Sequence, residues 1–178
     1  MNPVVLLEDK RFSIAVDRLC YELIENHSRF SNSVLIGLQP RGIYLAKNLY
    51  QRLLELQPDS VIQYGNLDAT FYRDDFRRRE MPIIPQPQEM NFVVEGKKVI
   101  LVDDVLFTGR TVRSALDALV DFGRPEKVEL LVLVDRRYSR HLPIEPDYVG
   151  ITVDTRSSQR VKVDWQETDG ANKVMLIN

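Results

Sequence analysis

One stretch of the chain, KKVILVDDVLFTGRT at residues 97–111, constrains the fold more than any other. Its mostly apolar first half is typical of a strand that is buried on both faces, and it leads directly into Asp103 and Asp104. A Thr-Gly-Arg-Thr turn follows, and apolar residues then recur at helical spacing over residues 110–122. A buried strand that passes through a short loop into a helix is the repeating unit of an α/β fold with a parallel sheet.

The rest of the chain repeats this alternation. Apolar residues at helical spacing predict a helix over residues 9–26 and another from Leu45 to Leu56. Apolar or β-branched runs predict strands over residues 33–38, 61–72, 97–103, 128–135, 148–153, 161–167 and 173–177. We therefore expect residues 1–178 to form a single α/β domain, in which helices flank a central, mostly parallel sheet and the C-terminal part is small and β-rich.

The composition excludes several classes of protein and of site. The single cysteine, Cys20, cannot form an internal disulfide; it fits the reducing cytosol, and we expect it to pack as a small apolar side chain. No apolar run approaches the roughly 20 residues of a membrane span, and the N-terminus lacks the basic start of a signal peptide. His27 and His141 are too isolated to predict a metal site, and Trp165 is expected to pack in the interior. A net charge of −2 provides no overall basic field for nucleic acid.

The residues that follow the strand at 97–103 predict a site with two ends. In open α/β sheets, ligands bind beyond the carboxyl ends of the strands, and Asp103 and Asp104 lie at such an end. Their carboxylates can accept hydrogen bonds from paired hydroxyls. Beyond them, Gly109 lets the backbone approach an anion closely, and the N-terminus of the next helix favours phosphate. A ribose 5-phosphate is the simplest ligand with both features; the alternative is that the two aspartates only cap the helix.

The stretch VILVDDVLFTGRT resembles the phosphoribosyl-pyrophosphate motif of type I phosphoribosyltransferases. Other segments resemble one branch of that family, the pyrimidine-operon attenuation regulators that are also uracil phosphoribosyltransferases (the PyrR family). They are PRGIYLAK at 40–47, FYRDD at 71–75, ALDALVDFGRP at 115–125, LVLVDR at 131–136 and LPI at 142–144. The resemblance spans roughly residues 10–165 and implies the type I phosphoribosyltransferase fold, with a mobile hood loop at about residues 70–90.

The resemblance also implies a role for each part of the core site. Asp103 and Asp104 would hold the ribose hydroxyls, and Arg41 would act with them in catalysis. The pyrophosphate loop would comprise Pro40, Arg41 and Gly42. The segment that binds phosphoribosyl pyrophosphate would comprise Val105, Leu106, Phe107, Thr108, Gly109, Arg110 and Thr111. For Arg41, a buried structural role is the alternative.

Two further segments receive roles from the resemblance. Tyr72 and Arg73 would lie at the base of the hood loop, in which the arginines at 77–79 are expected to be solvated. The base would lie against the end of the strand at 128–135, near Val134, Asp135 and Arg136. For Asp135, a cap of the strand end is the alternative.

The implied reaction joins uracil to phosphoribosyl pyrophosphate (PRPP) and gives uridine monophosphate (UMP) and diphosphate. Positive charge develops on the ribose carbon as the diphosphate departs, and fixed carboxylates stabilise such charge. Mg²⁺ is expected to bind mainly through the diphosphate and ribose oxygens, with few protein ligands. The single cysteine favours a cytoplasmic protein, and the resemblance implies a homo-dimer or a larger homo-oligomer.

The chain departs from the branch where an RNA hairpin of the operon leader would bind. It has RYSRHLPIE at 137–145, one residue longer before LPI than the branch, with Glu145 in place of an arginine and Ile151 in place of a lysine. Arg18 and Arg140 remain as candidate RNA contacts. Because lost cations weaken binding to an RNA backbone, RNA binding is expected to be absent or moved. A UMP-sensing attenuation regulator and a transferase for another base remain as alternatives to a uracil transferase.

Overall fold

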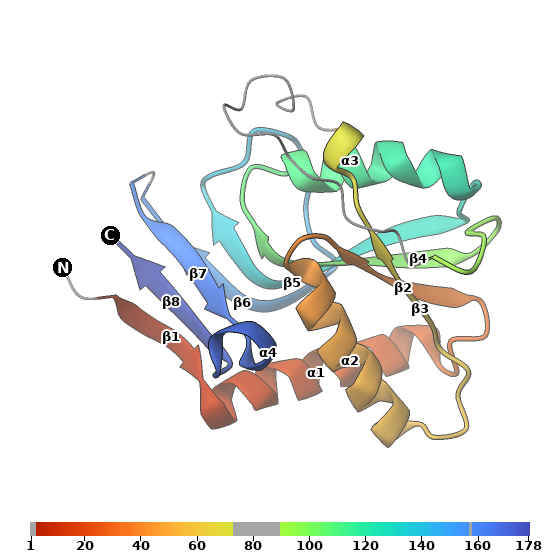
Figure 1. Cartoon of the computed structure of the whole chain (residues 1–178), viewed down its shortest axis with the longest axis horizontal. Helices are drawn as coiled ribbons and strands as arrows, with labels where there is room; N and C mark the ends of the chain where they lie inside the picture. The colour runs from red at the N-terminus through yellow and green to blue at the C-terminus, as the bar shows by residue number, and fades with distance from the viewer. Residues whose placement is uncertain (1–2, 73–89, 157) are drawn as a thin grey trace.

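A five-stranded parallel sheet forms the centre of the molecule (Figure 1). The computed structural model describes residues 3–72, 90–156 and 158–178. The strands are β2 (Ser33–Leu38), β3 (Gln63–Leu67), β4 (Lys98–Leu106), β5 (Lys127–Arg137) and β6 (Tyr148–Asp154), in the order β3-β2-β4-β5-β6. Each neighbouring pair is parallel, which confirms the predicted sheet.

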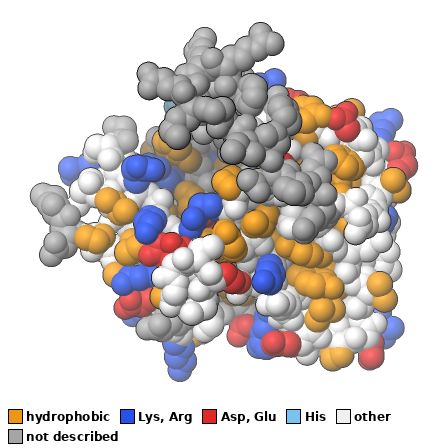
Figure 2. All heavy atoms as spheres, viewed as in Figure 1, with side chains coloured by type: hydrophobic (Ala, Val, Ile, Leu, Met, Phe, Trp, Pro, Cys, Tyr) orange, Lys and Arg blue, Asp and Glu red, His pale blue; other side chains and the backbone are white. Residues whose placement is uncertain are grey.

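A second, smaller sheet joins the two ends of the described chain (Figure 1). Its antiparallel strands are β1 (Val4–Glu8), β8 (Lys173–Ile177) and β7 (Arg160–Asp164), in that order. A short helix, α4 (Gln166–Asp169), connects β7 to β8. Lys and Arg side chains gather on the face of this sheet that Figure 2 shows.

Helices cover both faces of the central sheet. On one face lie α1 (Asp9–His27) and α2 (Gly42–Leu56), and on the other lies α3 (Arg110–Leu119), which continues into a 3₁₀ turn at Val120–Phe122. A further 3₁₀ turn, Thr70–Tyr72, lies against α3. None of the helices within residues 3–72, 90–156 and 158–178 combines the length and the apolar character that crossing a bilayer requires.

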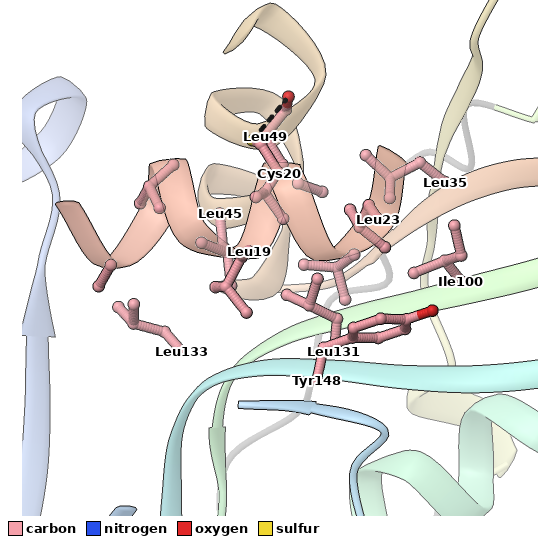
Figure 3. Packing of buried hydrophobic residues seen from close by; sticks show 14 of the residues in the cluster. Leu19, Cys20, Leu23, Leu35, Leu45, Leu49, Ile100, Leu131, Leu133 and Tyr148 are labelled. Atoms are coloured by element: carbon pink, nitrogen blue, oxygen red, sulfur yellow. Dashed lines mark hydrogen bonds between the residues drawn. The ribbon is translucent and has the colours of Figure 1, made fainter. Parts of the chain in front are cut away.

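Two apolar cores hold these layers together, because successive residues of a strand point to opposite faces of the sheet. In β4, Ile100 packs in the core under α1 and α2, whereas Leu101 packs in the core under α3. Figure 3 shows the first core, where Leu19 and Cys20 of α1 meet the other layers. Cys20 is the predicted apolar filler, and burial, the largest influence, raises the pKa of its thiol to about 12.

The sequence-based boundaries require four corrections. The strand predicted at 61–72 is paired only over Gln63–Leu67. The strand predicted at 97–103 continues to Leu106. The N-terminal strand β1 was not predicted, because its pairing partner, β8, lies at the other end of the chain. The strand predicted at 161–167 ends at Asp164. Trp165 then begins the turn into α4, but it is fully buried against Phe12, 5.6 Å between ring centroids, as its predicted packing role requires.

A buried polar cluster lies between α1 and the amino ends of β2 and β5. The Nδ1 atom of His27 is 2.8 Å from the Ser33 hydroxyl, and its Nε2 atom is 2.8 Å from the Glu129 carboxylate. The hydroxyl of Tyr148 donates to the same Glu129 carboxylate at 3.1 Å, and Lys127 pairs with it at 2.5 Å. Burial lowers the pKa of His27, and this effect outweighs the opposing attraction of Glu129.

This cluster predicts a loss of stability in mild acid. Because the folded-state pKa of His27 lies below its ordinary value of 6.5, the unfolded chain takes up the proton first, and stability decreases as the pH falls through about 6.5. Urea unfolding between pH 7.5 and 5.5 should show a decline of at most about 1.4 kcal/mol per pH unit for this one proton. His27→Gln should flatten the decline, whereas His141→Gln, at an exposed position, should not. Equal slopes in the two variants would contradict this role of His27.

Candidate active site

The site lies where the order of the sheet reverses. From β2 the chain passes to β3 on one side, and from there to β4 on the other side of β2. Pairing of β2 with β4 ends at Gly37 and Val102, but β4 stays paired with β5 as far as Leu106. The crevice beyond such a switch point is the usual ligand site of open α/β sheets.

Asp103 and Asp104 occupy the part of β4 that has lost its β2 neighbour. They therefore lie within the strand, whereas the sequence placed them at its end. Both are largely buried, and Asp103 Oδ1 accepts a hydrogen bond from the Asp104 amide at 2.9 Å. Burial raises the pKa of Asp104, and the nearby Arg41 opposes this shift. Two adjacent and largely buried carboxylates can stabilise positive charge on a bound ligand.

The loop after β2 packs directly against this segment. At Gly42 a Cβ atom would lie 2.4 Å from the carbonyl oxygen of Val102 and 2.9 Å from the Cα of Asp103, so only glycine fits there. The peptide bond between Gln39 and Pro40 is cis. The close approach of Gly42 to β4 places the predicted pyrophosphate loop next to the acid pair.

Arg41 connects the two sheets. Its Nε atom is 3.5 Å from Asp104 Oδ2, and its Nη2 atom is 3.5 Å from Asp169 Oδ2 at the end of α4. The same Nη2 also donates to the carbonyl of Val163 in β7. The side chain is 40% exposed, so part of it is open to a ligand in addition to these internal contacts.

The turn between β4 and α3 presents backbone amides at the start of a ten-residue helix. Gly109 has φ = +88°, a conformation that favours glycine, and it lies against Ile144. The carbonyl of Thr108 accepts hydrogen bonds from the amides of His141 at 3.0 Å and Leu142 at 3.3 Å. The turn is therefore held by the segment after β5, and the N-terminus of α3 that follows it can bind an anion.

The remaining residues of the predicted phosphate segment differ in accessibility. Val105 lines the crevice, the side chain of Leu106 is buried in the core under α3, and Phe107 is 41% exposed. Arg110 and Thr111 begin α3 and are partly exposed. Contact with a ligand by Leu106 would therefore have to come from its backbone.

The guanidinium of Arg140 holds in place the turn between β4 and α3 (residues 107–109), here called the phosphate turn. It donates to the carbonyls of Phe107 at 2.6 Å, Leu106 at 3.2 Å and Ile144 at 3.0 Å, and it pairs with Asp135. Asp135 therefore anchors Arg140 at the end of β5.

Arg18, the other candidate RNA contact, also forms hydrogen bonds within the chain. It donates to the carbonyls of Val149 at 2.8 Å and Gly150 at 2.6 Å and pairs with Glu22. The two arginines that were predicted as RNA contacts thus both have intramolecular partners.

The predicted base-binding residues Val134 and Arg136 are mostly buried. Val134 is fully buried in the core under α1 and α2, so its side chain does not face the crevice. Arg136 donates to Thr155 Oγ1 at 3.1 Å and to the carbonyl of Gln159 at 2.8 Å. Its guanidinium lies 4.0 Å from the centre of the Phe107 ring. Arg136 therefore links the phosphate turn to the segment that leads into β7.

Of the predicted hood loop, only its first part falls within the described residues. Tyr72 ends a 3₁₀ turn, and its hydroxyl donates to Asp121, just after α3; this hydrogen bond raises the pKa of Tyr72. Arg73 and the arginines at 77–79 lie outside the described residues.

A cavity of about 450 Å³ opens between Asp104 and the small sheet. Arg41, Asp104 and Val105 line one side; β7 contributes the other side, through Arg160, Val161, Lys162 and Val163. Arg160 and Lys162 were not predicted as site residues, although charged residues that alternate with valines indicate a strand with one polar face. In the part of the chain that the structure describes, no three His, Cys, Asp or Glu side chains gather as a protein-only metal site would require.

Comparison with known proteins identifies relatives along nearly the whole chain. Residues 5–168 match the phosphoribosyl transferase domain family. The chain is 46% identical over 162 residues to the bifunctional protein pyrR of Enterococcus faecalis, covering 91% of this chain and 89% of the relative. It is 44% identical over 171 residues to the bifunctional protein PyrR of Desulfosudis oleivorans, covering 96% and 94%.

Solved structures with the same fold are more distant in sequence. The hypoxanthine phosphoribosyltransferase of Trypanosoma cruzi has a TM-score of 0.73 at 15% identity, covering 98% of this chain and 95% of that one. A hypoxanthine phosphoribosyltransferase of Staphylococcus aureus has a TM-score of 0.71 at 21% identity, covering 96% and 90%. At such identities the likeness shows the fold alone, and it confirms the predicted one.

The close approach of Gly42 to β4 predicts that this position tolerates no side chain. Gly42→Ala should lower the free energy of unfolding by about 1–3 kcal/mol, because the added methyl group overlaps the Val102 carbonyl. Urea unfolding measures the change. Gly96→Asn is the matched control, since Gly96 has open space around it and asparagine tolerates its positive φ. Equal losses in the two variants would show that the contact with β4 is unimportant.

Proposed function

We propose that this chain, which belongs to the PyrR branch of the type I phosphoribosyltransferase family, transfers the phosphoribosyl group of PRPP to uracil and releases diphosphate. The observation that carries the proposal is the buried acid pair of β4 between Arg41 and the amide-rich turn at the start of α3. PRPP fits such a site. Its 5-phosphate and its diphosphate each need an anion-binding group, and the ribose between them needs a carboxylate.

In the proposed mechanism, the acid pair acts on the ribose. The 5-phosphate occupies the N-terminus of α3, where Thr108 and Gly109 shape the turn. Asp103 and Asp104 then face the sugar hydroxyls and accept their hydrogen bonds. As the bond from the ribose carbon to the diphosphate breaks, the carbon gains positive charge, and the fixed carboxylates stabilise it. No solvent has to reorganise, since both acids are already desolvated.

Arg41 is proposed to receive the leaving diphosphate. Its guanidinium is held by Asp104, Asp169 and the Val163 carbonyl, so it is already oriented before substrate binds. A guanidinium forms paired, charge-assisted hydrogen bonds with phosphate oxygens. Preorganised charge of this kind stabilises a departing anion more than a mobile side chain does.

The acid pair also fits a Mg²⁺ ion that binds mainly through its substrate. Two adjacent carboxylates supply oxygen ligands, too few for an all-protein site, and Mg²⁺ commonly combines one or two carboxylates with substrate phosphates. Asp103 and Asp104 are the residues proposed to hold it. When bound, Mg²⁺ supplies positive charge that stabilises the leaving diphosphate.

Uracil is proposed as the acceptor because identity to proteins named PyrR runs along nearly the whole chain. The base is proposed to lie at the end of β5 near Asp135 and Arg136. Because both side chains bond within the chain, backbone groups there are proposed to contact the base. RNA attenuation, the alternative activity, receives less support from the structure, since Arg18 and Arg140 both bond within the chain. A homo-oligomer remains a prediction from the resemblance.

Removing the charge of Asp104 should abolish most of the activity. Asp104→Asn keeps the shape of the side chain but loses the stabilisation of the ribose cation, so we expect the kcat for release of diphosphate from PRPP to fall by about 10²–10³-fold. Asp117→Asn makes the same change at an exposed position on α3 and should leave turnover unaltered. Wild-type turnover in Asp104→Asn would remove the acid pair from the mechanism.

A panel of bases in one diphosphate-release assay tests the acceptor. With PRPP and Mg²⁺ present, uracil should support turnover, and cytosine, hypoxanthine and guanine should not. Turnover with a purine but not with uracil would replace the proposed acceptor while leaving the transferase assignment intact.

A further inference from the structure

Two cations on β7 line the same cavity as Asp104. Arg160 and Lys162 line its small-sheet side, and Asp104 lines the opposite side together with Arg41. β7 is an edge strand, paired only with β8, so its other edge is open to the cavity. The hydrogen bond from Arg41 to the Val163 carbonyl holds this edge of β7 next to the pyrophosphate loop.

Cations outnumber acids among the described residues that line the cavity. Arg41, Arg160 and Lys162 are cations and Asp104 is an acid. Arg41 also pairs with Asp169, which is not among these lining residues. Lys162 pairs with Asp164 at 2.7 Å, yet half of its side chain stays exposed. Among the described residues, no carboxylate forms an ion pair with Arg160.

A neighbouring buried cation adds to this excess. Arg136 is 5% exposed, and its pKa is lowered first by burial and then by repulsion from Arg160. Two guanidiniums this close repel each other, and an anion bound beside Arg160 offsets that repulsion. A neutral base does not offset it, so the charge of the cavity favours a phosphate group over the base as the partner of these cations.

We infer that Arg160 and Lys162 bind the diphosphate of the donor from the side of the small sheet, opposite Arg41. This inference rests on the proposed function and adds residues of a second sheet to its leaving-group site. The diphosphate then lies between cations of the loop after β2 and cations of β7. Binding of the leaving group thereby depends on the position of the small sheet relative to the central one.

Direct titration of the protein with inorganic diphosphate and Mg²⁺ tests the inference without any turnover. Isothermal calorimetry should show binding about tenfold weaker in Arg160→Gln and in Lys162→Gln, and about a hundredfold weaker in the double variant, because each change removes charge-assisted hydrogen bonds. Arg160→Lys should retain most of the affinity. Lys173→Gln is the matched control: it removes the same charge from the same sheet, on β8, where Lys173 pairs with Glu8 outside the cavity. Its affinity should equal that of the wild type.

The possible outcomes separate this inference from the proposed function. If the wild type binds diphosphate and the Gln variants bind it equally well, the inference fails and the proposed function stands. If the Gln variants lose affinity for uracil but not for diphosphate, the two cations face the base and the inference also fails. If the wild type neither binds diphosphate nor releases it from PRPP, the proposed function fails and the inference fails with it. Thermal unfolding of each variant shows whether a loss of binding reflects a loss of fold.

Discussion

The contact between Gly42 and the backbone of β4 is the constraint on which the rest of the site depends. Any side chain at position 42 would overlap the backbone of Val102 and Asp103, so the loop after β2 lies directly against β4. β4 has lost its β2 neighbour at this point, so the loop takes the place of a strand. Arg41 follows from the same geometry, because the residue before Gly42 is carried to the carboxylate of Asp104 and to the edge of β7.

Local patterns predicted much of this architecture. The buried run before Asp103, the Thr-Gly-Arg-Thr turn and the periodic helix after it were visible without a structure, because each is specified by neighbouring residues. The end of β4 was wrong by three residues, since pairing with β5 decides where that strand stops. Strand β1 was missed for the same reason: its short apolar run becomes a strand only beside β8, which no local pattern reveals.

The roles of several cationic side chains could not be predicted from the sequence. Arg18 and Arg140 have the charge of RNA contacts, but their carbonyl acceptors come from distant segments, β6 and the turn after β4. Arg160 and Lys162 looked like ordinary polar positions of a strand, and only the packing of the small sheet against β4 places them on the cavity. For a long cationic side chain, the acceptor within reach decides its role, and acceptors depend on tertiary structure.

The small sheet joins β1, near the start of the chain, to β8, near its end, and its inner edge closes the cavity. β1 and β8 lie far apart in the sequence, so β8 is synthesised long after β1. β1 has to wait for β8 before it finds its partner. The core under α1 and α2 is also complete only when Val163, Trp165 and Val174 are in place. Arg41 likewise gains its contacts with β7 and α4 only after these C-terminal segments have been synthesised. A nascent chain that stalls before β8 emerges would carry the acid pair without the sheet that closes over it.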